Sequence, residues 1–282
     1  MQRRSAVHWA IEDKQVSERR ACRLLRQSRS TQRRQLGGRT QTDDGVARRL
    51  AELAEAHPAW GFPQLHRQLR QEGHLINHKR TRRLYRQQGL TLRRRRRRRP
   101  PERVRQALVQ PLEPNCCWSM DFMHDTLSNG RAFRTFNVID DFAREVLAID
   151  IDFSISGARV VRVLEQLCEW HGKPATIRSD NGPEFRSEAV QKWASTNGVA
   201  WHFIEPGCPA QNAYVERFNG TFRVEVLDAN RFQTLGDARA QIAHWIPIYN
   251  EQRSHKAIGN LPPMVFKQRW QERQSLLLTG SA

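Results

Sequence analysis

The sequence predicts an α/β protein in which a mixed sheet with flanking helices follows an all-α region. Residues 115–270 alternate short β-branched runs with longer stretches of apolar residues at helical spacing, which is typical of strands alternating with helices. Residues 1–90 show only helical spacing, interrupted by glycines and polar breaks. A hydrophobic content of 38% is low for a globular chain and favours a solvated helical region beside a compact domain.

The positive charge is concentrated in the first part of the chain. Residues 1–110 contain 29 Lys and Arg against 9 Asp and Glu, whereas residues 111–282 contain 18 against 20. A basic half joined to a near-neutral half indicates that the first part binds a polyanion, whereas the second is a compact domain with a different role. Because Arg predominates and suits both phosphate and guanine recognition, we expect the polyanion to be double-stranded DNA.

The N-terminal segment, residues 1–38, is predicted to be a helix-turn-helix-like unit. Ser17 is placed to cap one helix, and a polar break precedes a second, Arg-rich helix that begins near Ser28 or Ser30. The apolar side of the first helix is expected to carry Ala21, Leu24 and Leu25. An ordinary solvated helical hairpin explains this stretch equally well.

A second helical unit is predicted over residues 39–90. One helix ends near His57-Pro58, and two more lie on either side of Gly73. Basic side chains line the outer faces of the last helix, and those expected to contact DNA are Lys79, Arg80, Arg82 and Arg83. The spacing of His74 and His78 resembles part of a zinc site, but no cysteine lies between residues 23 and 115 to complete one.

Residues 91–114 are predicted to be an extended Arg-rich linker that lies along DNA phosphates. A run of like charges cannot fold alone, and each phosphate contact releases counterions, so the affinity for DNA should fall steeply with salt. A tether without fixed structure is compatible with the same role. The seven consecutive arginines are Arg93, Arg94, Arg95, Arg96, Arg97, Arg98 and Arg99.

The compact domain, residues 115–270, is predicted to begin with three strands joined by short turns and to continue as helix, strand, helix, strand and helix. The expected strands are 118–127, 133–140, 146–151, 175–179 and 199–204. The expected helices are 157–171, 187–197, one around Glu216, and 235–249. The tail, residues 271–282, is expected to be frayed from Gln274 on.

Three carboxylates from this domain are candidates for one site. Asp180 follows a buried strand, where open α/β sheets tend to place chemistry, and Glu216 lies within a helical pattern after 35 intervening residues. Asp121 lies upstream on an alternating run. Like charges around one cavity repel each other unless cations separate them, and carboxylate oxygens favour Mg²⁺ or Mn²⁺. Spacing alone leaves Asp125, Asp140 and Glu184 as competitors.

This order and spacing resembles the D-D-35-E signature of retroviral-integrase-like transposases, and specifically the second-frame (OrfB) transposases of two-frame bacterial insertion sequences. The resemblance implies a ribonuclease-H-like integrase catalytic core and a DDE transposase that cleaves and joins DNA strands through a 3′-hydroxyl. No covalent protein–DNA intermediate is then needed. It also implies two Mg²⁺ or Mn²⁺ ions per site, with Asp121 bridging both and Asp180 and Glu216 each completing one.

Further residues near this signature are expected to touch DNA. Arg223 lies seven residues after Glu216 on nearly the same helical face, where the family commonly has Lys or Arg. Asn181 precedes a glycine that lets the backbone approach a phosphate, and Asn212 either caps the Glu216 helix or touches DNA. Arg217 is the fourth residue of this DNA-contacting set. Structural roles explain each of these residues nearly as well.

The sequence predicts a cytoplasmic, nucleoid-associated bacterial protein. The cysteines include the adjacent pair Cys116-Cys117 and no CxxC, which indicates a reducing compartment, and no run is long enough for a membrane span. The resemblance adds as partners the product of an upstream frame and further copies of this chain on DNA. Two alternatives remain open: a catalytically inactive or domesticated DNA-binding regulator, and a ribonuclease-H-type nuclease.

Overall fold

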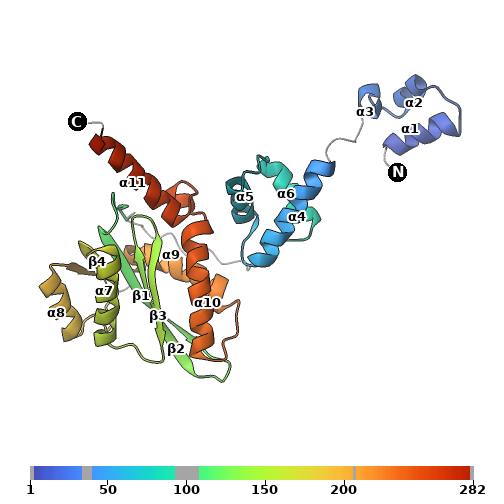
Figure 1. Ribbon diagram of the computed structural model, residues 1–282. Coiled ribbons are helices and arrows are strands. Elements are labelled where there is room, and N and C mark those ends of the chain that lie inside the picture. Colours follow the sequence, from blue (N-terminus) through green and yellow to red (C-terminus); the bar gives the residue numbers. More distant parts are fainter. Residues whose placement is uncertain (1–2, 34–39, 93–107, 206–207, 280–282) are drawn as a thin grey trace. The chain divides into compact units, whose positions relative to one another are not determined.

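The computed structural model describes residues 3–33, 40–92, 108–205 and 208–279 (Figure 1). The chain divides into two compact units, Met1–Arg49 and Leu50–Ala282, which are described separately. The division falls within helix α4, Thr40–Ala56. The predicted linker arginines, residues 93–99, lie outside the described residues.

The first unit contains three short helices, α1 (Arg3–Glu12), α2 (Glu18–Leu24) and α3 (Arg29–Arg33). The helices expected after Ser17 and near Ser28 are therefore present, whereas α1 was not predicted. Their small core is built from Val7, Ala21 and Cys22. The prediction that Leu24 lies on the apolar side is wrong, because the buried face of α2 runs through Ala21 and Cys22 and leaves Leu24 70% exposed.

The second unit begins with the last turns of α4 and continues through α5 (Phe62–Gln71) and α6 (His78–Gln87). The chain turns between α5 and α6 at Gly73, whose φ of +88° favours glycine. Asn77 caps α6 by accepting a hydrogen bond from the Lys79 backbone N–H at 2.8 Å. The predicted helices on either side of Gly73 are thus confirmed.

A five-stranded mixed sheet forms the centre of the compact domain. Its strands are β1 (Cys117–Thr126), β2 (Ala132–Asp140), β3 (Glu145–Asp152), β4 (Thr176–Ser179) and β5 (Ala200–Phe203). They lie in the order β3-β2-β1-β4-β5, with the first three antiparallel and with β4 and β5 running parallel to β1. Together with the order of the helices, this confirms the ribonuclease-H-like arrangement that the resemblance implies.

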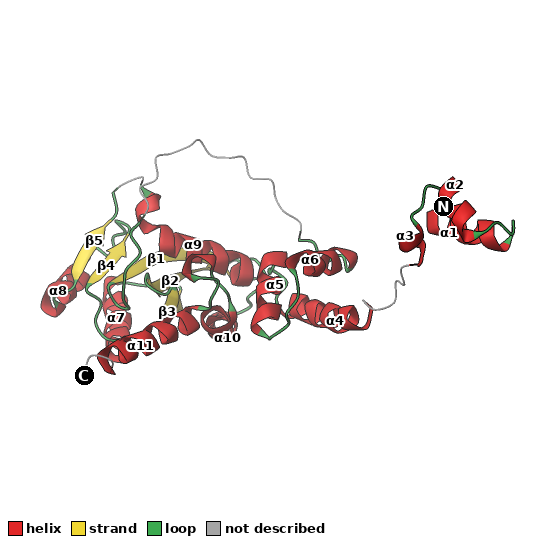
Figure 2. Ribbon diagram, turned by 90° about the horizontal axis from the view of Figure 1, so that it is seen from above, coloured by secondary structure: helices red, strands yellow, loops and turns green. Residues whose placement is uncertain are grey.

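Helices cover both faces of the sheet (Figure 2). On one face, α7 (Gly157–His171) and α8 (Glu188–Asn197) pack over a core that includes Trp118, Phe136 and Ile177. On the other, α9 (Ala213–Phe222) and α10 (Leu235–Pro247) pack over Phe133, Ile139 and Val146. Strand β2 therefore buries both of its faces, and its residues from Thr135 to Asp140 are all buried.

Shorter elements complete the domain. Arg223–Leu227 and Ile248–Gln252 continue α9 and α10 as π-helical turns, and 3₁₀ turns occur at Pro209–Asn212 and Lys256–Ile258. The last helix, α11 (Pro263–Thr279), shows that fraying from Gln274 is a wrong prediction, because the chain stays helical to Thr279. Across the described ranges, each helix is too short or too polar to cross a membrane.

Candidate active site

Two of the candidate carboxylates lie side by side at the centre of the sheet. Strands β1 and β4 are paired in parallel up to Ser119 and Arg178, so two residues further along each strand come Asp121 and Asp180. Neighbouring strands lie about 4.8 Å apart. Asp180 directly follows β4, and its Oδ1 accepts the Gly182 N–H at 3.0 Å. A Cβ at position 182 would lie 3.1 Å from that oxygen, which explains the glycine.

Helix α9 places Glu216 on the same side of the sheet as these two carboxylates. The helix is anchored by Phe218 and Phe222, which are 2% and 0% exposed and pack together with ring centroids 5.9 Å apart. Glu216 itself lies in the first turn and is exposed. At the helix start, the Asn212 side chain donates from Nδ2 to the Met120 carbonyl of β1 at 3.1 Å, which ties α9 to the strand that carries Asp121.

Asp121 is the most perturbed of the three candidate acids. Burial raises its pKa to about 6, and the charges of Asp180 and Glu216 act in the same direction. Two hydrogen bonds oppose this rise: Oδ1 accepts the Phe122 backbone N–H at 2.8 Å, and Oδ2 accepts Nδ2 of Asn219 at 2.7 Å. Partial burial also raises the pKa of Glu216. Asp121 is therefore electrostatically coupled to both of the other acids.

Salt bridges distinguish these acids from their competitors. Asp125 pairs with Arg223 at 3.2 Å, and Glu184 pairs with Arg134 of β2. Asp140 is fully buried and accepts two backbone N–H groups, at 3.0 and 2.8 Å. Within the described part of the chain, none of the three candidate acids takes part in an ion pair. No cation among the described residues therefore pairs with their negative charge.

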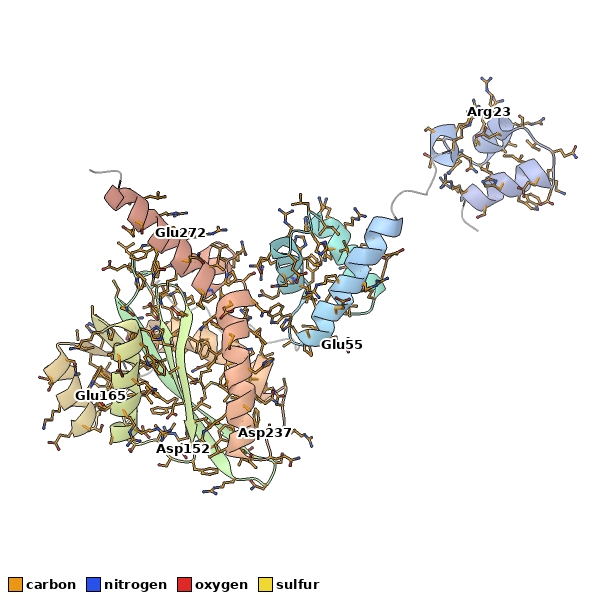
Figure 3. All side chains as sticks on the ribbon, in the orientation of Figure 1. Arg23, Glu55, Asp152, Glu165, Asp237 and Glu272 are labelled. Carbon is orange, nitrogen blue, oxygen red and sulfur yellow. The ribbon has the colours of Figure 1, made fainter. Side chains whose placement is uncertain are left out.

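Some of the other acidic side chains lie at the surface. Figure 3 labels Glu165 on α7 and Glu272 on α11, which are exposed. It also labels Asp152 on β3, which lies 3.7 Å from Arg159 and 3.9 Å from Arg239. These acids are either hydrated or paired with arginine, so they need no further cation.

The donor chemistry of the three candidate acids fits a divalent cation, because hard carboxylate oxygens with uncompensated charge are the ligands that Mg²⁺ and Mn²⁺ prefer. Their arrangement is not a closed cluster. No three His, Cys, Asp or Glu side chains are gathered to hold a metal ion anywhere in the ranges that the structure describes. A metal site that uses Asp121, Asp180 and Glu216 together therefore remains a prediction.

The residues predicted to touch DNA differ in their surroundings. Besides its pairing with Asp125, the Arg223 guanidinium donates to the His124 carbonyl at 2.6 Å. Asn181 donates to the Ile204 carbonyl at 2.6 Å and accepts from Arg186 at 2.6 Å, so it joins two loops. Arg217 is exposed on α9, next to Glu216.

Asn212 departs from the capping role predicted for it. It occupies the N-cap position of α9, but its side chain makes no capping hydrogen bond, so the capping prediction is wrong. The side chain is 2% exposed and donates to Met120 instead, which leaves it closed to a DNA contact in this conformation. Its observed role is to brace α9 against β1.

The basic side chains predicted on α6 point outward. Lys79, Arg82 and Arg83 are exposed, and Arg80 is half-buried. The buried side of the helix carries Thr81, Leu84 and Tyr85. This alternation leaves a cationic face on the helix, as the sequence predicted.

Two residues of the site were not predicted from the sequence. Asn219 of α9 contacts Asp121 directly, and Asn137 of β2 donates from Nδ2 to Asn219 Oδ1 at 2.7 Å. Asn219 lies three residues after Glu216, the spacing that places two side chains on one helical face. That spacing was the available clue. The contribution of β2 depends on strand pairing, in which Asn137 lies opposite Asp121.

Comparison with known proteins agrees with these features. Residues 111–209 and 197–263 match models described as "Integrase core domain", and residues 41–98 match an "HTH-like domain". The chain is 45% identical over 258 residues to an "Insertion element IS407 uncharacterized 31.7 kDa protein" of Burkholderia multivorans, covering 91% of this chain and 93% of that protein.

Two further comparisons are more distant. The chain is 26% identical over 239 residues to "Putative transposase InsK for insertion sequence element IS150" of Escherichia coli, covering 79% of this chain and 82% of that protein. The solved HTLV-2 integrase catalytic core domain in complex with magnesium aligns with a TM-score of 0.46 at 19% identity, covering 55% of this chain and 98% of that chain.

Proposed function

Because the chain belongs to the family of insertion-sequence transposases with an integrase core and an HTH-like domain, we propose that it is a DDE transposase that cleaves and joins DNA strands in a metal-dependent reaction. The observation that supports this most strongly is the set of three coupled carboxylates. Asp121, Asp180 and Glu216 come from three different elements, and the described residues neutralise none of them. Such a set is unfavourable without cations and suited to hold them.

In the proposed reaction Asp121, Asp180 and Glu216 would hold two Mg²⁺ or Mn²⁺ ions. When bound, such ions stabilise the charge that develops on the attacking and leaving oxygens of a phosphodiester. First, water attacks the phosphodiester at the element's end, forming one P–O bond and breaking another. The freed 3′-hydroxyl then attacks a target phosphodiester in the same way. Because each step exchanges one P–O bond for another, no protein nucleophile is required.

The remaining residues would bind and orient the substrate. Arg223 is proposed to hold a phosphate beside the acids, with Arg217 and Asn181 on the rim of the site. The cationic face of α6 and the linker arginines 93–99 are proposed to bind double-stranded DNA. Recognition of two element ends would bring copies of this chain together, and an upstream-frame product is the proposed additional partner.

The test is a cleavage assay with the purified full chain, MgCl₂, and a duplex that carries the flanking inverted repeats, in which 3′ nicks are mapped. Asp121→Asn, Asp180→Asn and Glu216→Gln should each abolish nicking and leave the DNA mobility shift largely intact. Glu165→Gln, on the exposed face of α7, is the matched acidic control and should nick normally. Full activity in any one of the three variants removes that residue from the site.

The same assay separates the alternatives. A catalytically inactive or domesticated regulator shifts DNA and produces no nicks in any metal. A ribonuclease-H-type nuclease cleaves an RNA–DNA hybrid in preference to the duplex. The HTH-like region favours duplex DNA over the RNA–DNA hybrid, and five Lys and Arg side chains lie along α6.

A further inference from the structure

A chain of two amide side chains leads from the sheet to Asp121. Asn219 of α9 donates from Nδ2 to Asp121 Oδ2 at 2.7 Å, and Asn137 of β2 donates from Nδ2 to Asn219 Oδ1 at 2.7 Å. Asn137 is 0% exposed and Asn219 is 8% exposed. Neither takes part in the proposed bond exchange, so their placement needs a separate explanation.

The direction of both hydrogen bonds follows from the charge of Asp121. An ionised carboxylate only accepts hydrogen bonds, so Asn219 must present its NH₂ group to it. The carbonyl of Asn219 then faces Asn137, which must in turn present its own NH₂ group. Asn137 therefore prevents the Asn219 amide from turning over and placing its oxygen against the carboxylate.

Asn137 occupies this position at a cost to stability. Its Oδ1 atom is buried and has no hydrogen-bond partner among the described residues. On the same face of β2 lie Phe133 and Ile139, which belong to the apolar core beneath α9 and α10. A buried acceptor without a hydrogen-bond partner is destabilising, and a leucine of similar size would not leave one at this position. A buried amide kept at such a cost beside a candidate site residue points to a functional reason.

We propose that Asn219, held in place by Asn137, is a positioning residue that orients the Asp121 carboxylate to bind two divalent cations at once. The inference rests on the proposed function. The Phe122 N–H occupies one acceptor position on Oδ1, and Asn219 occupies one on Oδ2. Each oxygen keeps one free acceptor position, which is what a carboxylate needs to bridge two ions. The same bond fixes α9, the helix that carries Glu216, to β1.

The test measures metal affinity directly. Mn²⁺ is titrated into the purified full chain, and the EPR signal of the free ion gives the dissociation constant, while urea unfolding without metal gives the stability. Asn137→Leu should weaken Mn²⁺ binding about 10-fold with little change in the unfolding midpoint, because it removes the unsatisfied Asn137 carbonyl but also the donor to Asn219 Oδ1. Asn219→Leu should weaken binding further, within the 10–100-fold range typical of residues that orient metal ligands.

Thr135→Val is the matched control. Thr135 lies two residues from Asn137 on the same face, is 0% exposed, and its Oγ1 also lacks a partner among the described side chains and backbone groups. It does not contact Asp121, so Mn²⁺ affinity should not change. If Asn137→Leu fails to fold, Asn137→Ser, which is too short to reach Asn219, gives the same measurement with less steric change.

The outcomes separate this inference from the proposed function. If wild type binds Mn²⁺ and Asp121→Asn does not, while both the Asn137 and the Asn219 variants bind as wild type, the positioning role is wrong and the proposed site stands. A loss of stability with unchanged affinity also overturns it, because that is what a purely structural amide would give. If wild type and Asp121→Asn bind Mn²⁺ equally, the proposed site itself fails.

Discussion

Replacing Asp121 with Asn should stabilise the integrase core and abolish DNA cleavage at the same time. The carboxylate is held in a position where burial and the charges of Asp180 and Glu216 raise its pKa to about 6. Asn has nearly the same shape and no charge. It can also keep the hydrogen-bond chain: once the carboxylate charge that fixes their orientation is gone, Asn219 and Asn137 can turn over together, and Asn137 Oδ1 then becomes the acceptor.

The magnitude follows from the pKa. A rise from the ordinary 3.8 to about 6 costs the ionised core about 3 kcal/mol as an upper bound, at about 1.4 kcal/mol per pH unit. Because the folded pKa is the higher one, the folded state binds more protons, and wild-type stability falls as pH rises from about 4 to about 6. The advantage of Asp121→Asn should therefore be absent near pH 3.5, grow through this window, and stay constant above pH 7.

Urea unfolding of both proteins at several pH values between 4 and 8, in EDTA, measures this difference. We expect the variant to be more stable by about 1–3 kcal/mol at pH 8. Mg²⁺ should stabilise wild type and not the variant, because ligands stabilise only the protein that binds them. An Asp121→Asn protein that is less stable than wild type at pH 8 without metal would refute the repulsion argument, even if cleavage were lost.

Three further predictions test other parts of the site and fold. Asp125→Asn should leave cleavage intact and change the free energy of unfolding by less than about 1 kcal/mol, because its pair with Arg223 is partly exposed. Arg223→Gln should instead slow nicking about 10-fold. Equal loss in both variants would mean that the pair acts as a unit. Lys79→Gln and Arg82→Gln should each reduce the slope of log affinity against log salt by about one in fluorescence anisotropy, and an unchanged slope would remove that residue from the interface. Phe222→Ala should cost the core about 3–5 kcal/mol in urea unfolding, because the ring is 0% exposed, and a cost below about 1 kcal/mol would contradict the packing described for α9.

The elements of the core were predictable because their signals are local. The helix at Gly157–His171 was predicted with the bounds observed, since apolar residues recur at helical spacing between a serine and a glycine. The first helix, Arg3–Glu12, was missed although Val7, Ala10 and Ile11 recur at helical spacing, because so short an apolar face gives a weak signal. The end of α11 was also missed, because its leucines build no buried face: Leu276 and Leu277 are 70% and 66% exposed.

The candidate site was less predictable, because charge pairing depends on contacts distant in sequence. Asp125 and Glu184 could not be separated from Asp121 and Asp180 by spacing. Their arginine partners come from α9's continuation and from β2, 98 and 50 residues away along the chain. The role of Asn137 depends on the register between β1 and β2, which the sequence does not specify. A signature thus identifies which acids are candidates, and the fold determines which of them remain unpaired.

The three acids differ in how many hydrogen bonds hold their carboxylates in place. Asp121 is held by two donors, and Asp180 accepts the Gly182 N–H. Glu216 is exposed in the first turn of α9, and its carboxylate has no hydrogen bond to any residue that the structure describes. Ordering such a side chain costs up to about 2 kcal/mol of conformational entropy. If all three acids bind the same cations, the Glu216 side chain is therefore the one that must reorient. The hydrogen bonds from Asn137 to Asn219 and from Asn219 to Asp121 keep the Asp121 carboxylate in place.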